Sequence, residues 1–79
     1  MSEKRGSKPR VVEATARQLE CLAWVAEGKT AAEIGIILDI SPRTVQTHLA
    51  RACGAFGVHK TVQAVVKAQE RDMLPDVRR

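Results

Sequence analysis

Aromatic residues are almost absent from this chain of 79 residues, which contains one tryptophan, one phenylalanine and no tyrosine. Because Trp24 and Phe56 are the only aromatic side chains, aliphatic residues must supply nearly all of the core. A chain of this length can bury one small core. We therefore expect a single small domain whose core is thin and mainly aliphatic.

Cysteines are also scarce, since Cys21 and Cys53 are the only two. Their spacing matches neither a disulfide framework nor a metal-binding template. A zinc site that combines them with His48 and His59 would have a spacing that fits no known template. We expect each cysteine to pack as a small apolar residue in a reduced, cytosolic protein, and we expect no metal.

The chain has no apolar run close to the roughly 20 residues that a membrane-spanning helix needs, and we expect no signal peptide. We therefore expect a cytoplasmic protein without a membrane partner. The formal net charge is +4 and the pI is about 9.6, which suits a polyanionic partner.

Residues capable of catalysis are not arranged in a catalytic motif. No serine or cysteine lies in a nucleophile motif, and no glycine-rich loop is present that could hold a phosphate. His48 and His59 have no obvious carboxylate partner. The sequence therefore argues against an enzyme, and we expect no cofactor.

Apolar residues recur with a helical period between the two polar ends of the chain, and no segment alternates like a strand. These residues predict four helices, at about residues 16–27, 31–38, 42–56 and 62–72. Residues known to cap helices mark most of the boundaries. The start signals are the capping boxes Thr15–Gln18 and Thr30–Glu33, the pair Ser41–Pro42, and Thr61; the end signals are Gly28 and Gly57.

The predicted fold is an all-α four-helix bundle in residues 11–75, preceded by a disordered basic arm or linker (1–10) and followed by a frayed tail (76–79). A three-residue turn joins the second and third helices, which is helix-turn-helix geometry. Gly35 costs about 1 kcal/mol relative to alanine inside a helix, and close crossing by another helix would explain its presence. The predicted inward positions are Leu19, Leu22, Val25, Ala26, Ile34, Ile37, Leu38, Val45, Leu49, Ala52 and Phe56. The apolar positions of the fourth helix are Val62, Val65, Val66 and either Met73 or Leu74.

The face of the third helix opposite its buried stripe contains short polar side chains and no acid. It consists of Arg43, Gln46, Thr47, Ala50 and Gly54, at positions i, i+3, i+4, i+7 and i+11. Exposed helix faces ordinarily mix glutamate with lysine. Glutamine and threonine can instead pair with base edges in a DNA groove. A neutral solvated face is the alternative interpretation.

Acidic residues are absent from the whole segment 40–69, which contains four basic residues, Arg43, Arg51, Lys60 and Lys67. The nine acidic residues of the chain all lie before or after this segment. A carboxylate near a nucleic-acid backbone would repel its phosphates. The segregation of charge therefore favours a surface that contacts phosphates.

Residues 27–58, EGKTAAEIGIILDISPRTVQTHLARACGAFGV, strongly resemble the DNA-binding domain of LuxR-type transcriptional regulators (the LuxR/FixJ family). The similarity extends from TARQLECL, which begins at residue 15, to VQAVVKA, which ends at residue 68. The resemblance implies four helices, a third helix that enters the major groove, and a fourth that mediates dimerisation. It implies double-stranded DNA as the partner, a nucleoid-associated location and RNA polymerase as a candidate second partner.

Site residues follow from the resemblance position by position. Base-reading positions are matched by Gln46, Thr47, Ala50 and Arg51. Phosphate positions are matched by Lys29, Thr30, Arg43, Thr44, His48 and Lys60. The alternative for His48, which the sequence favours over a phosphate contact, is a packing histidine with one hydrogen bond. The expected dimer surface is a stripe on the fourth helix that is wider than so small a core needs: Val62, Val65, Val66 and Gln69.

The chain also departs from the family pattern. Ala14 replaces the usual leucine before Thr15, Gln18 replaces a usual glutamate, and Ala55–Phe56 and Lys60–Thr61 replace the usual Lys–Leu and Asn–Arg pairs. The last two changes remove or move a positive charge that could contact a phosphate. Two alternatives to the LuxR-type regulator therefore stay open: a sigma-factor-like promoter-recognition domain, and a protein-interaction module of the same fold with weak DNA binding.

Overall fold

The structure, a computed structural model, describes residues 12–78. This part of the chain folds into four helices. They are α1 (Ala16–Ala26), α2 (Ala31–Leu38), α3 (Pro42–Phe56) and α4 (Thr61–Glu70), and the described residues include no strand. The predicted all-α fold with a helix-turn-helix is confirmed. Residues 1–11, which include the predicted arm, and residue 79 lie outside the described part.

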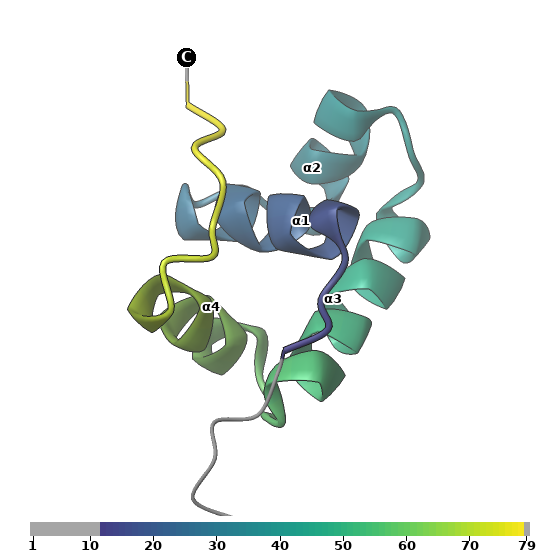
Figure 1. Ribbon diagram of the computed structural model, residues 1–79. Coiled ribbons are helices and arrows are strands. Elements are labelled where there is room, and N and C mark those ends of the chain that lie inside the picture. Colours follow the sequence, from purple (N-terminus) through teal and green to yellow (C-terminus); the bar gives the residue numbers. More distant parts are fainter. Residues whose placement is uncertain (1–11, 79) are drawn as a thin grey trace, which may run out of the picture.

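α1 and α3 are the central elements, because each of them contacts all three other helices. In Figure 1, α1 crosses the middle of the molecule, with α2 and α3 on one side and α4 on the other. α3 therefore packs against its neighbours along one side and leaves its other side exposed.

Helix starts are set by side chains that accept backbone hydrogen bonds, as predicted for the first three helices. α4 differs, because its N-cap residue Lys60 offers no side-chain acceptor. At this helix start only Gln63 Oε1 accepts backbone N–H groups, those of Lys60 (3.0 Å) and His59 (3.2 Å). Lys60 is thus the residue before the helix, and the prediction that Thr61 caps a helix starting at residue 62 is wrong. The confirmed caps are Thr15 with Gln18 (3.1 Å), Thr30 with Glu33 (3.2 Å) and Ser41 with Thr44 (3.0 Å).

All four helices end in the same backbone motif, in which a residue with a positive φ angle stops the helix. Glycine has this role after α1 and α3, but aspartate has it after α2 and α4. α1 therefore ends at Ala26 and α4 at Glu70, one and two residues earlier than predicted. The left-handed residues are Gly28 (φ 89°), Asp39 (φ 59°), Gly57 (φ 69°) and Asp72 (φ 55°).

Small side chains dominate the core and let the helices approach closely. One cluster, formed by α1, α3 and α4, contains Leu22, Ala52, Cys53, Ala64, Val65 and Ala68. A second cluster, where α2 packs on α1 and α3, contains Cys21, Ile34 and Val45. Both cysteines are buried free thiols, as predicted, and burial raises the pKa of Cys21.

Three predictions about packing are wrong. Ile37 is 43% exposed and Ala26 is also exposed, so neither is a core residue. Gly35 does not accommodate a crossing helix: a Cβ atom there would lie 2.6 Å from the carbonyl oxygen of Ile40, in the turn between α2 and α3. Glycine at this position therefore lets the turn fold back against α2.

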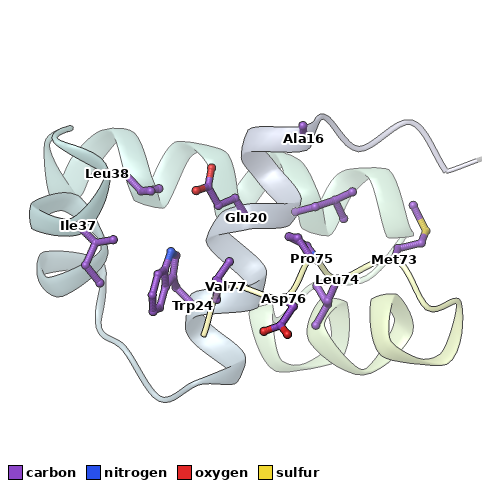
Figure 2. Close-up of a pocket in the computed structure, with 11 residues that line it drawn as sticks. Ala16, Glu20, Trp24, Ile37, Leu38, Met73, Leu74, Pro75, Asp76 and Val77 are labelled. Atoms are coloured by element: carbon purple, nitrogen blue, oxygen red, sulfur yellow. The ribbon is translucent and has the colours of Figure 1, made fainter. Parts of the chain in front are cut away.

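The C-terminal segment packs along α1 instead of fraying. Val77 is half-buried, and Arg78 Nε lies 3.7 Å from Glu27 Oε2. Figure 2 shows the groove of about 730 Å³ that this segment forms with α1 and the end of α2, next to the ring of Trp24. The indole Nε1 of Trp24 is buried and has no hydrogen-bond partner among residues 12–78.

Candidate nucleic-acid interface

The outward side of α3 follows from the packing of its other side. Val45 and Ala52 have no exposed surface, which fixes the rotation of the helix against α1 and α2. The exposed large apolar side chains of residues 12–78 all belong to other helices. The predicted outer face is therefore exposed, as expected, at Arg43, Gln46, Thr47, Ala50 and Gly54, and Arg51 is exposed beside it.

Thr47 is oriented by a hydrogen bond within α3. Its hydroxyl donates to the carbonyl oxygen of Arg43, at 3.1 Å. The hydroxyl proton is thus already engaged, so the methyl group and the oxygen lone pairs are what Thr47 offers to a ligand. A methyl group on this face suits contact with the methyl group of thymine.

Two hydroxyl groups lie together at the start of α3. The Oγ of Ser41 accepts the backbone N–H of Thr44 (3.0 Å) and lies 2.9 Å from the hydroxyl oxygen of Thr44. The two hydroxyls carry two protons and only one lies between them, so the other can be donated outward. Both residues are exposed, and this proton is available to a phosphate oxygen.

The start of α2 combines a basic residue with an acidic one. Lys29 and Thr30 are exposed, as expected for residues that contact a DNA backbone. The backbone N–H of Thr30, however, donates to Glu33 Oε1 at 2.8 Å. This hydrogen bond, together with the charge of Lys29, lowers the pKa of Glu33 below its ordinary value. A carboxylate that stays ionised therefore lies beside these two residues.

His48 and His59 occupy different surroundings. His48 is half-buried, and within the described part of the chain its ring forms no hydrogen bond, so the hydrogen bond expected for a packing histidine is not present. His59 is exposed and lines a recess of about 470 Å³ together with Gln46, Ala50 and Thr61. Sequence reasoning did not select His59 or Thr61, because only the folding of the α3–α4 turn brings them to the outer face of α3.

The outer face of α4 exposes two valines among polar side chains, and it differs from the predicted stripe at one residue. Val62 is 62% exposed and Val66 is 45% exposed, and Gln69 is exposed beside them. Val65 is only 8% exposed and belongs to the core, so its assignment to the dimer surface is wrong. Val62 and Val66 line a shallow groove with Val58, Gln63, Lys67 and Glu70.

Two further observations concern residues 12–78 alone. No three His, Cys, Asp or Glu side chains in this range come together as metal ligands could. None of the four helices is long and apolar enough to cross a membrane.

A helix-turn-helix whose second helix exposes a polar, basic face defines a class of DNA-binding domains. Comparison with known families agrees with this class. The family model described as "Bacterial regulatory proteins, luxR family" matches residues 14–68, so the chain belongs to this family. It is a helix-turn-helix DNA-binding domain of transcriptional regulators and not an enzyme.

Individual relatives are similar to the same region. The chain is 48% identical over 64 residues to the transcriptional activator protein VanR of Vibrio anguillarum, and 52% identical over 54 residues to SolR of Ralstonia solanacearum. These matches cover 81% and 68% of the chain but only 26% and 23% of the relatives, so the chain spans about a quarter of their length. The solved structure of the transcription factor GerE superposes with a TM-score of 0.74 at 26% identity, covering 84% of this chain and 97% of that one.

Proposed function

We propose that this domain binds double-stranded DNA at specific sequences by inserting α3 into the major groove. The observation that carries the proposal is the exposed outer face of α3, which is polar and basic and contains no acid. Gln46, Thr47, Ala50 and Arg51 would read base edges, with His59 and Thr61 beside them in the recess. The proposed phosphate contacts are Lys29, Thr30, Arg43, Thr44, His48 and Lys60.

The test is selection of binding sites from random duplex DNA, followed by a salt titration of the selected site. If about four to six phosphates are neutralised per dimer, log K should fall with log salt at a slope near −4 to −5. A slope close to zero between low and physiological salt would contradict nucleic-acid binding and favour a protein-interaction module.

We propose further that the domain pairs on DNA as a homodimer through α4. Support comes from the exposed Val62 and Val66, an apolar surface that a monomer leaves in water. Lys67 and Glu70 line the same groove and could pair across a two-fold axis. The patch is small, so we expect a monomer at micromolar concentration that pairs only on DNA. Sedimentation with and without a selected two-fold site measures this.

The relatives VanR and SolR are named as transcriptional activators. We propose by analogy that this domain acts in activation, inside the cytoplasm and with RNA polymerase as its second partner. Transcription in vitro from a promoter that contains the selected site tests the proposal, because an activator raises the transcript level and a repressor lowers it.

A further inference from the structure

Three of the four helices begin with the same side-chain-to-backbone hydrogen bond, but only one of them uses a charged side chain. Gln18 accepts the backbone N–H of Thr15 at 3.0 Å, and Gln63 accepts that of Lys60 at 3.0 Å. At the start of α2 the acceptor of the Thr30 N–H is Glu33, at 2.8 Å. A neutral amide makes this bond twice in the same molecule, so the bond itself does not require a carboxylate.

The charged cap lies where a negative charge opposes the proposed function. The carboxylate of Glu33 is bonded to Thr30 and is close enough to Lys29 for the lysine charge to lower the pKa of Glu33. Lys29 and Thr30 are both proposed phosphate contacts. A phosphate bound there would therefore lie near the negative charge of Glu33, and the charge of Lys29 would act on both anions.

We infer that Glu33 is an affinity-setting residue that keeps DNA binding by this domain weak. The inference rests on the proposed phosphate contacts of Lys29 and Thr30. Repulsion between Glu33 and the backbone acts on any duplex, so it lowers specific and non-specific affinity together. If a single domain binds weakly, a stable complex needs further favourable contacts. Base contacts and pairing of two domains would supply them.

The experiment compares Glu33→Gln with Glu20→Gln in the full chain of 79 residues. Both changes remove one negative charge, but Glu20 is on α1 and lines the groove under the C-terminal segment, where its partner is Arg17. Affinity is measured for a duplex of mixed sequence at low and physiological salt, and thermal unfolding is recorded for each variant.

At low salt we expect Glu33→Gln to tighten binding about three- to tenfold, with a smaller gain at physiological salt because exposed charges are screened. Glu20→Gln should change affinity less than about twofold, because Glu20 is not near the proposed contacts. The melting temperature of Glu33→Gln should stay close to that of the unchanged chain, since glutamine can accept the same hydrogen bond.

Equal tightening by both variants would overturn the inference, because the effect would then come from net charge alone. Unchanged or weaker binding by Glu33→Gln would overturn it as well. The variant Lys29→Ala shows whether such a result contradicts only the role of Glu33 or also the proposed phosphate contacts at the start of α2. If Lys29→Ala weakens binding while Glu33→Gln does nothing, the phosphate contact stands and only the role of Glu33 is wrong; if both are silent, the start of α2 does not contact DNA.

Discussion

The outer faces of α3 and α4 are both exposed to water, yet only α4 exposes large apolar side chains among its polar ones. On α3 most exposed side chains are polar or basic, and none of the exposed large apolar side chains of residues 12–78 belongs to this helix. On α4, Val62 and Val66 are exposed at 62% and 45%. A polar face free of acids suits a polyanion, whereas exposed valines suit another protein surface. The two adjacent helices are thus suited to different partners, as the proposals of DNA reading by α3 and pairing through α4 require.

Two adjacent valines of α4 test which side of this helix faces the core and which side faces water. Val65 is in the core and Val66 is outside it, although the two are neighbours in sequence. Val65→Glu should destabilise the domain by about 3 kcal/mol or more, because it buries a charge without a partner. Val66→Glu should change stability by less than about 0.5 kcal/mol, as surface changes do. Urea unfolding of both variants measures the difference.

The same pair tests dimerisation, for which Val66→Glu is the informative variant because it should remain folded. We expect it to bind a single half-site normally and to lose cooperative pairing on a two-fold site. If this folded variant still pairs with undiminished cooperativity, the dimer surface is elsewhere. A stably folded Val65→Glu variant would contradict the assignment of Val65 to the core.

The proposed DNA interface can be divided in a similar way, into side chains on α3 that read bases and side chains elsewhere that only contact phosphates. Gln46 projects from the middle of this face, whereas Lys29 lies at the start of α2. Gln46→Ala should cost roughly 1–3 kcal/mol on the preferred site and much less on scrambled DNA. Lys29→Ala should weaken both DNAs by similar factors and flatten the salt slope by about one phosphate.

Affinities of both variants on both DNAs at two salt concentrations decide between these roles. The unchanged chain on scrambled DNA serves as the reference for non-specific binding. If Gln46→Ala and Lys29→Ala reduce specific and non-specific binding alike, Gln46 does not read a base, and α3 only lies near the backbone.

Local signals in the sequence were sufficient for most of the fold. Thr15, Thr30 and Ser41 cap the helices that they were predicted to cap, and α2 and α3 have the predicted bounds. The tail could not be predicted this way, because its residues are mostly polar and only tertiary packing brings Val77 against α1. Neither could the left-handed Asp39 and Asp72, since aspartate signals such a conformation far less strongly than glycine.

The candidate site was predictable on α3 and less so on α4. On α3 the apolar stripe is narrow, so the outer face follows by subtraction. On α4, Val62, Val65 and Val66 are all apolar, and helical period alone cannot decide which of them faces the core. That choice depends on how α4 approaches α1 and α3. The recess that includes His59 and Thr61 was missed for a related reason, since it depends on the path of the α3–α4 turn.

The smallest effect on stability is expected in two turns, the one that leads into α3 and the one that follows α4. Asp39 and Asp72 both have a left-handed backbone, with φ of 59° and 55°, a conformation that strains an L-residue and not glycine. Changing either one to glycine relieves this strain but also adds freedom to the unfolded chain. We therefore expect Asp39→Gly and Asp72→Gly each to raise the free energy of unfolding by only about 0.5–1 kcal/mol.

Gly57→Ala is the matched reverse change, since it introduces a side chain at a left-handed position with φ of 69° where no atom lies close enough to clash. It should therefore destabilise the domain through backbone strain alone, by about 1 kcal/mol. Urea unfolding of the three variants gives the signs. If Asp39→Gly lowers stability while Asp72→Gly raises it, the Asp39 side chain stabilises the turn before α3 in a way that backbone strain does not describe. The entry into α3 would then depend on that side chain and not on backbone conformation alone.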